Sequence, residues 1–283
     1  MATPDDTAAN DPAPDLYATL RTAIREEDPV ALATVIGGSG LGEEGVEAGN
    51  KLLVRPDGTC LGGLGNDDLD RVVIRDSIGE LRAGTTGVRH YGPRGQARQD
   101  ELDNFIESFA RPPQMLIFGA VDFTAALCRV AKVLGYRVTV CDARPVFATK
   151  QRFPYADDVV VDWPNRLLDR VGPDLGVRDA ICVLTHDPKF DVPAVLSAVQ
   201  TDAGYIGAMG SRRTTEDRNR RLLDEGVDPD DLRRVMAPIG LDIGGRTPEE
   251  TAISVCAEII ALHSGRVAPS LRDVEGDIHR VTD

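Results

Sequence analysis

The sequence has few cysteines and no long apolar run, and each scarcity excludes a class of protein. Its five cysteines have neither paired nor metal-ligand spacing, so neither a disulfide framework nor a metal site is expected. No apolar run approaches the ~20 residues that cross a bilayer. The first fifteen residues are acidic and rich in alanine and proline, unlike a signal peptide. These features predict a cytoplasmic protein without membrane association.

Positive charge is also scarce. The 32 Lys and Arg residues face 46 Asp and Glu residues, which gives a formal net charge of −14. Such a field repels polyanions, so nucleic acid and anionic membrane surfaces are not expected as partners. Any phosphate site must therefore depend on local positive charge.

What is present indicates a folded protein of two domains. Apolar residues make up 42% and charged residues 28% of the 283 residues, as in globular proteins. Two prolines after Arg111 mark the expected boundary. The expected divisions are a flexible tail over 1–13, an N-terminal domain over 14–111, a C-terminal domain over 112–266 and a second tail over 267–283.

The N-terminal domain is predicted to be a small α+β unit, because apolar residues alternate between helical and strand spacing along it. The expected elements are a helix over 14–27, a strand over 30–38, a hairpin over 51–64, a helix over 66–84, a loop over 91–104 and a strand over 105–110.

From Gln114 onward, short apolar strands alternate with amphipathic helices. This pattern is typical of a parallel sheet covered on both faces. Helices are expected from about 122, over 165–171, and from about 191, 211 and 247. The chain is therefore predicted to be an α/β protein with a Rossmann-like C-terminal domain. Ligands of such sheets bind at the carboxyl ends of the strands, so the residues that follow each strand are the candidates.

The turn after the first strand of this domain is a poor dinucleotide fingerprint. Glycine would be needed at 119, 121 and 124, and only Gly119 is present. Val121 would crowd a pyrophosphate, and Asp122 places a carboxylate at the helix N-terminus, which would otherwise attract phosphate. Gly119 stays a candidate cofactor-binding residue. The alternative is a structural turn with Asp122 as the N-cap.

Polar residues follow the next strands as well. Asp142 lies 23 residues after Gly119, close to the spacing at which an acidic residue holds a ribose hydroxyl. Arg144 could hold a phosphate, or could pair with Asp142 to close the turn. His186 follows the strand AICVLT and is the best-placed group that titrates near neutral pH. Its alternative role is a histidine hydrogen-bonded within a turn.

Two glycine-rich loops near the C-terminus favour an anionic ligand. In GYIGAMGSRR, glycines allow backbone amides to converge, Ser211 can cap a helix, and two arginines add positive charge. A solvated basic turn is the alternative. In PIGLDIGGRTPEE, Thr247 and Glu250 form an expected capping box, while the preceding loop could approach a ligand closely. The candidate cofactor-binding residues from these loops are Gly207, Gly210, Ser211, Arg212, Arg213, Gly240, Asp242 and Gly244.

Several long segments resemble the XdhC/CoxI family, in the expected order over residues 29–265. GYIGAMGSRR, PIGLDIGGRTPEETAISVCAEI, VTVCDARPVFA and LTHDPKFD resemble its C-terminal domain, and ALATVIGGSG with AGNKLLVRPDGT resembles its N-terminal domain. The resemblance implies an accessory factor, non-enzymatic or weakly enzymatic, that binds molybdenum cofactor as molybdopterin or its cytosine dinucleotide form. It also implies protection of the cofactor during sulfuration by a cysteine desulfurase and delivery to a molybdenum hydroxylase. A homo-oligomer is expected.

One segment departs from the family pattern. After the DGT turn the family usually has Ser-Gly-Gly-Cys-x-Glu, and here Asp68 stands where the cysteine would be. Cys60 is the only cysteine of the N-terminal domain that could take its place, and a simple strand residue is the alternative. The short length and the GAVDFTAAL turn look more like the CoxF-type members associated with CO dehydrogenase.

Two other functions compete with cofactor maturation. An NAD(P)-dependent oxidoreductase is favoured by the fold and by Asp142, and opposed by Val121 and Asp122. A scaffold that binds only a protein partner is opposed by the two glycine-rich loops. We predict no catalytic residue and no metal ligand.

Overall fold

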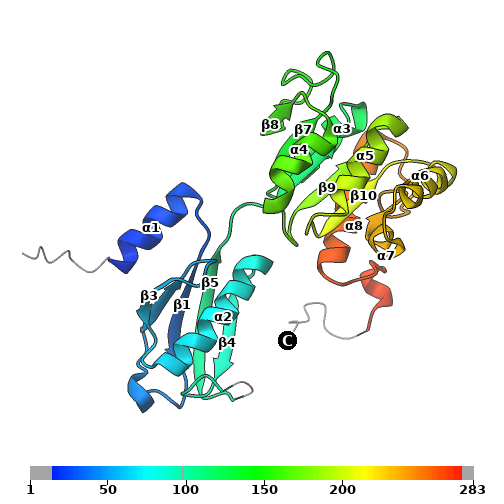
Figure 1. Cartoon of the computed structure of the whole chain (residues 1–283). Coiled ribbons are helices and arrows are strands. Elements are labelled where there is room, and N and C mark those ends of the chain that lie inside the picture. Colours follow the sequence, from blue (N-terminus) through cyan, green and yellow to red (C-terminus); the bar gives the residue numbers. More distant parts are fainter. Residues whose placement is uncertain (1–14, 97–98, 276–283) are drawn as a thin grey trace, which may run out of the picture. The chain divides into compact units, whose positions relative to one another are not determined.

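The computed structural model describes residues 15–96 and 99–275. The chain divides into two compact units, the first ending at Arg111 and the second starting at Pro112. Figure 1 shows a separate sheet in each unit, and each unit has its own buried core. The first sheet is antiparallel and the second is parallel, which confirms the predicted α/β fold class.

The first unit is a five-stranded antiparallel sheet with strand order β3-β2-β1-β5-β4 and a helix on each face. Its elements are α1 (Leu16–Glu26), β1 (Val30–Gly37), a 3-10 turn (Glu43–Gly45), β2 (Lys51–Val54), β3 (Cys60–Gly63), α2 (Asp67–Ala83), β4 (Gly87–Tyr91) and β5 (Leu102–Phe109). Successive residues of β1 face opposite sides. Ala31 and Ala33 pack with α2, while Val30 and Leu32 pack with α1.

Strand β4 was not expected from the sequence, and β5 starts at Leu102 instead of 105. The alternation of apolar and polar residues that marks a strand is missing from β4, because it is an edge strand whose Val88, Arg89 and His90 side chains are exposed. Polar contacts hold it: Arg89 donates to Glu80 at 2.6 Å, and His90 Nδ1 lies 2.8 Å from Asp103. The predicted tail over 1–13 and residues 97–98 of the predicted loop lie outside the described residues.

The second unit is a six-stranded parallel sheet with strand order β11-β10-β9-β6-β7-β8. Its strands are β6 (Gln114–Phe118), β7 (Arg137–Cys141), β8 (Asp158–Val160), β9 (Ala180–Val183), β10 (Tyr205–Ala208) and β11 (Val235–Met236). Its helices are α3 (Asp122–Val133), α4 (Pro164–Val171), α5 (Pro188–Ala198), α6 (Arg212–Asp224), α7 (Pro229–Arg233) and α8 (Pro248–His263), with 3-10 turns at Gly172–Asp174 and Leu271–Asp273.

Both faces of this sheet are buried, as its continuous apolar strands predict. Met115 and Ile117 of β6 face α3 and α8, while Leu116 and Phe118 face the core that includes α4 and α5. The short elements α7 and β11 escaped sequence analysis because one helical turn and two strand residues carry too little periodicity to recognise. Helix α5 starts at Pro188, earlier than the expected 191, with Asp187 as its N-cap.

The strand order is that of a dinucleotide-binding fold, in which the chain runs outward from β6 to β8 and then returns to β9. The connections after β6 and β9 therefore leave in opposite directions. This point between Gly119 and Leu184, at the carboxyl ends of the two strands, is where such sheets hold ligands.

Candidate functional site

Because all six strands are parallel, the residues that follow them meet at one edge of the sheet. Gly119 follows β6, Asp142 follows β7, Thr185 follows β9 and Gly210 follows β10. Gly207 is the exception among the candidates, since it lies inside β10.

The turn after β6 is closed by its own protein contacts. A Cβ on Gly119, whose φ is +113°, would lie 2.9 Å from the backbone nitrogen of Thr185, so the close approach of β9 requires glycine here. The expectation that Asp122 caps α3 is wrong: the N-cap is Val121, which makes no side-chain cap hydrogen bond. Asp122 is the first helical residue, its side chain is 90% exposed, and it lies 3.7 Å from Arg152.

Asp142 joins the turns after β6 and β7. Its Oδ2 accepts a hydrogen bond from the Ala120 amide at 2.8 Å, and its Oδ1 accepts from both the amide and Nε of Arg144 at 2.9 Å. Burial alone would raise the pKa of Asp142, but these donors together with the Arg144 charge hold it below its usual value. Both carboxylate oxygens are therefore engaged, which is the geometry of the alternative Asp-Arg pair. A ribose hydroxyl would have to displace one of these donors.

The crevice at the switch point is nearly filled. A cavity of about 10 Å³, roughly the space of one water molecule, is lined by Gly119, Cys141, Asp142, Ala143, Pro164, Thr185 and Phe190. Gly119 and Asp142 are thus brought together as predicted neighbours. A nucleotide at this depth would require the Phe190 side chain and its neighbours to move.

Cations and aromatic rings are grouped around Phe190, which lines this crevice. The Arg144 guanidinium lies 4.6 Å from the ring centroid of Phe147 and 5.9 Å from that of Phe190. The ring centroids of Trp163 and Phe190 are 5.0 Å apart, and the Lys189 ammonium is 5.1 Å from the Trp163 ring centroid. Aromatic rings and cations that lie close together suit a planar anionic ligand. We refer to Arg144, Phe147, Trp163, Lys189 and Phe190 as the aromatic rim.

Of the aromatic rim, only Arg144 was among the candidate residues predicted from the sequence. A signal was present, because the loop between β7 and β8 gathers Arg144, Phe147, Arg152 and Phe153 within a short span. Trp163 and Phe190 belong to other segments, and only the fold brings them beside this loop. Arg152 also reaches the first turn, where its Nη1 donates to the Ala120 carbonyl at 3.2 Å.

His186 lies at the carboxyl edge but outside the small cavity. Its side chain is exposed, and among the described residues no protein group is hydrogen-bonded to its ring. The alternative role, a histidine hydrogen-bonded within a turn, therefore receives no support from this geometry. A ligand-binding role stays a prediction.

The first turn of α6, directly after the β10 loop, carries exposed positive charge. Ser211 caps α6 by accepting a hydrogen bond from the Thr214 amide at 3.2 Å, as predicted. Arg212 and Arg213 are exposed at the first turn of this helix, and neither forms an ion pair with any described residue. The α6 N-terminus and these two exposed arginines thus lie within one helical turn.

The glycines of the two loops have different physical roles. A Cβ on Gly207 would lie 2.6 Å from the Ile239 side chain, and one on Gly240 would lie 2.5 Å from Ser254 Oγ. Packing explains glycine at Gly207, while Gly240 combines this packing with a φ of +93°. Gly210, with a φ of +150°, and Gly244, with a φ of +76°, instead adopt conformations that favour glycine.

The loop after β11 is anchored against α8. The Gly240 amide donates to Glu258 at 2.9 Å, and Ser254 Oγ donates to the Leu241 carbonyl at 2.5 Å. Asp242 and Gly244 lie farther along the loop and are exposed. The capping box of Thr247 and Glu250 is confirmed.

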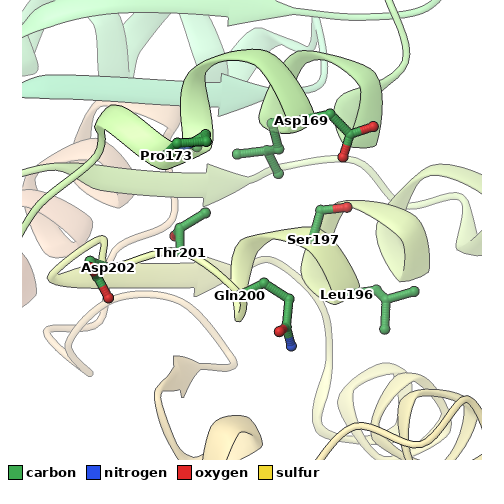
Figure 2. A pocket seen from close by; sticks show the side chains of 9 residues that line it. Asp169, Pro173, Leu196, Ser197, Gln200, Thr201 and Asp202 are labelled. Carbon is green, nitrogen blue, oxygen red and sulfur yellow. The ribbon is translucent and has the colours of Figure 1, made fainter.

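A separate hollow of about 520 Å³ lies between the C-terminal halves of α4 and α5. Figure 2 shows Asp169, Ser197 and Gln200 around it. Because α5 leads from there into the start of β10, the hollow is on the opposite edge of the sheet from the candidate residues. Its nine lining residues include two carboxylates and no cation, so it does not suit an anion.

Within residues 15–96 and 99–275, no three His, Cys, Asp or Glu side chains are grouped as a metal site would require. No helix in the same ranges is both long and apolar enough to span a bilayer. Cys60 is exposed and the other four cysteines are buried.

The comparisons with known proteins agree with the two units. Residues 115–259 match the XdhC Rossmann domain, and residues 23–92 match the XdhC and CoxI family. A probable xanthine dehydrogenase subunit of Bacillus subtilis is 33% identical over 162 residues, which cover 57% of this chain and 46% of the relative. The molybdenum cofactor insertion chaperone PaoD of Escherichia coli is 24% identical over 161 residues, 57% of this chain and 43% of PaoD.

A further relative, the uncharacterized protein YqeB of Escherichia coli, is 27% identical over 218 residues, 74% of this chain and 40% of YqeB. The chain thus spans less than half the length of these curated relatives. A crystal structure of a xanthine dehydrogenase from Bacillus halodurans shares the fold with a TM-score of 0.50 and 21% identity, over 89% of this chain and 97% of that one. The family match over more than half of the residues carries the assignment: this chain belongs to the XdhC and CoxI family.

Proposed function

We propose that this protein binds molybdenum cofactor at the carboxyl edge of its parallel sheet and delivers it to a xanthine dehydrogenase-type enzyme. The observation that carries the proposal is the α6 N-terminus, where Arg212 and Arg213 are exposed and form no ion pair with any described residue. In a chain with a net charge of −14, such a local cationic site is selective for an anion. The insertion chaperone PaoD among the relatives supports molybdenum cofactor as that anion.

The described residues fit both chemical parts of this cofactor. A terminal phosphate needs amide donors and guanidinium groups, which Ser211, Arg212 and Arg213 supply. A planar pterin, or the cytosine of a dinucleotide form, needs flat surfaces and cations, which the aromatic rim supplies. We place the phosphate at α6 and the ring system toward the rim.

We further propose that a cysteine desulfurase adds sulfur to the cofactor while this protein holds it, and that CO dehydrogenase-type enzymes are a second class of recipient. Burial raises the thiol pKa of Cys128, Cys141 and Cys256 to about 12, so these residues stay protonated. A thiol relay through the second unit is therefore not part of the proposal. The free state of all five cysteines supports a cytoplasmic setting.

An NAD(P)-binding oxidoreductase is the competing function, and the strand order favours it. The turn after β6 argues against NAD(P) binding. Its Ala120 amide, which would face a pyrophosphate, already donates to Asp142, and the crevice beside it holds only about 10 Å³.

The first experiment identifies the bound molecule. The protein is purified from a molybdenum-replete host, and the released small molecules are analysed by mass spectrometry. A pterin phosphate near one equivalent is expected, and the same chromatogram reports any NAD(P). Recovery of a nicotinamide nucleotide instead of a pterin would overturn the proposal.

The second experiment locates the anion. We expect Arg212→Ala or Arg213→Ala to weaken cofactor binding by about 1.5–3 kcal/mol, because a charge-assisted hydrogen bond is removed. Arg221→Ala is the matched control, since it removes the same charge from the last turn of the same helix. Equal losses of cofactor affinity in all three variants would indicate that only the total charge of the protein matters and that α6 has no local anion site. Thermal unfolding of the empty proteins shows whether the arginines are structural.

A further inference from the structure

A buried polar cluster lies behind the loop that follows β10. Thr185 Oγ1 donates to the Asp191 carboxylate, and Asp191 Oδ2 lies 3.9 Å from Nη1 of Arg218. The same Nη1 donates to the Met209 carbonyl at 3.0 Å. Asp191 is 2% and Arg218 is 3% exposed. The cluster therefore joins the ends of β9 and β10 through α5 and α6.

Arg218 has more donors than this cluster uses. Among the described residues, no protein group lies within hydrogen-bonding distance of its Nε or Nη2. Thr215, one turn earlier on the same face of α6, is 8% exposed, and its Oγ1 is likewise without a partner in the described part of the chain. Buried donors without acceptors cost free energy, so this cluster is incomplete as a purely internal network.

The charge of Arg218 is also poorly balanced. An arginine stays protonated even when buried. Its nearest carboxylate, Asp191, is too far away for a hydrogen bond at 3.9 Å. Burial raises the pKa of Asp191, a rise that the Arg218 charge only partly opposes. The interior beside α6 thus holds a cation with too little compensating charge.

The guanidinium lies beside the proposed phosphate site. Side chains on a helix point back toward its N-terminus, and Arg218 reaches Met209, two residues before the N-cap Ser211. A Cβ on Gly210 would be 3.9 Å from Arg218 Nη1. The Arg218 guanidinium therefore lies near the Met209–Ser211 loop, which leads directly into the helical turn that carries Arg212 and Arg213.

We propose that Thr215 and Arg218 form the inner wall of an oxyanion site whose outer wall is Ser211 and the first turn of α6. The ligand class is a tetrahedral dianion, such as inorganic phosphate or the terminal phosphate monoester of a cofactor. Arg218 Nε and Nη2 donate to two of its oxygens, and the Thr215 hydroxyl donates to a third. Since Arg218 is 3% exposed, the Met209–Ser211 loop moves aside at Gly210 when the anion enters. This inference rests on the proposed function only where the dianion belongs to a cofactor.

The test measures inorganic phosphate binding to the whole protein by calorimetry. Thr215→Val keeps the side-chain volume and removes the hydroxyl, and we expect about 3- to 10-fold weaker binding. Arg218→Met alone would leave Asp191 unpaired, so it is combined with Asp191→Leu to preserve folding. The double variant should lose at least about tenfold in phosphate affinity. Arg221→Ala again controls for total charge.

The outcomes separate this inference from the proposed function. Unchanged phosphate binding in both Thr215→Val and the double variant overturns the inference, whatever cofactor the protein carries. Phosphate binding that depends on Arg218, in a protein that yields no pterin, supports the site and identifies free phosphate as its ligand. If the double variant loses phosphate affinity and also yields no pterin on purification, the dianion that this site binds is the phosphate of the cofactor. If Thr215→Val binds phosphate normally and only the double variant loses binding, the Thr215 hydroxyl does not contact the anion. The proposed inner wall of Thr215 and Arg218 is then wrong.

Discussion

At the scale of single residues, Asp142 shows how one side chain can serve the fold where a ligand was expected. Its position after β7 is the one from which an acidic residue holds a ribose. In this structure its oxygens bind the Ala120 amide and Arg144, and it is 5% exposed. The same contacts that close the first turn also hold Arg144 against the Phe147 ring. Asp142 thus positions Arg144 within the aromatic rim.

We predict that Asp142→Asn lowers the free energy of unfolding by about 1–3 kcal/mol at neutral pH, because a buried carboxylate loses its charge-assisted hydrogen bonds. The folded-state pKa of Asp142 is lowered. Its contribution is therefore complete above the unfolded pKa of ~3.9 and declines as pH falls through the lower folded value. Urea unfolding of wild type and variant from pH 7 to pH 3 measures the difference.

Asp158→Asn is the control for that experiment. Asp158 also lies in the sheet, but its side chain is 50% exposed and its ion pair with Arg137 is 3.3 Å long. Exposed pairs contribute little, so its effect should stay below about 0.5 kcal/mol at every pH. A difference for Asp142→Asn that grows as pH falls would contradict the sign of the pKa change.

At the scale of elements, the glycine-rich motif at β10 contains residues with different roles: Gly207, inside the strand, serves packing, and the residues of the following loop belong to the proposed binding site. Gly207 pairs with Cys182 of β9 on one side and Met236 of β11 on the other. Its neighbours Tyr205 and Ile239 occupy the space that a side chain would take. Its membership in a glycine-rich motif therefore reflects close packing beside the loop, while Gly210 and Ser211 form the loop itself.

We predict that Gly207→Ala destabilises the second unit by about 1–3 kcal/mol, because the new methyl group meets the Ile239 side chain and the Tyr205 ring. Gly176→Ala is the matched control, since nothing lies within 4 Å of a Cβ there. Thermal unfolding compares the two. If the Gly207→Ala protein is as stable as wild type but has lost phosphate affinity, the ligand requires the absence of a side chain at this position.

At the scale of the whole molecule, the chain contains two units with separate cores. The first core, around Leu52 and Ile106, and the second, around Ile117 and Cys182, share no residue. The candidate residues and the buried cluster all belong to the second unit. We propose that the first unit contributes recognition of a protein partner, and that homo-oligomerisation adds to it.

We predict that Ile106→Ala, which removes a fully buried side chain, destabilises the first unit by about 2–5 kcal/mol. Phosphate affinity should be unchanged, because the site is built entirely from the second unit. Hydrogen exchange followed by mass spectrometry assigns the lost protection to one unit or both. Ile253→Ala, at a side chain 53% exposed, is the control. Equal loss of protection in both units would show that they unfold together.

The sequence by itself determined the elements and the class of fold. Apolar strands, helix caps such as Ser211 and Thr247, and the prolines after Arg111 are local signals, and local signals can be read along a chain. The same holds for the family resemblance, which is a matter of residue order. Short or edge elements such as β4 and β11 escaped because their stability comes from neighbours and not from their own pattern.

Only the tertiary structure decided which candidates meet and what each one does. Asp142 lies beside Ala120, Phe190 lies beside Arg144, and Arg218 reaches back beneath Gly210, and each contact joins separate elements. The burial of Arg218 was invisible in the sequence, where it reads as one more charge on a basic helix. Burial and hydrogen-bond satisfaction depend on everything packed around a group. That is the physical reason why the sequence predicted the edge of the sheet that holds the site, and the fold alone specified the contacts within it.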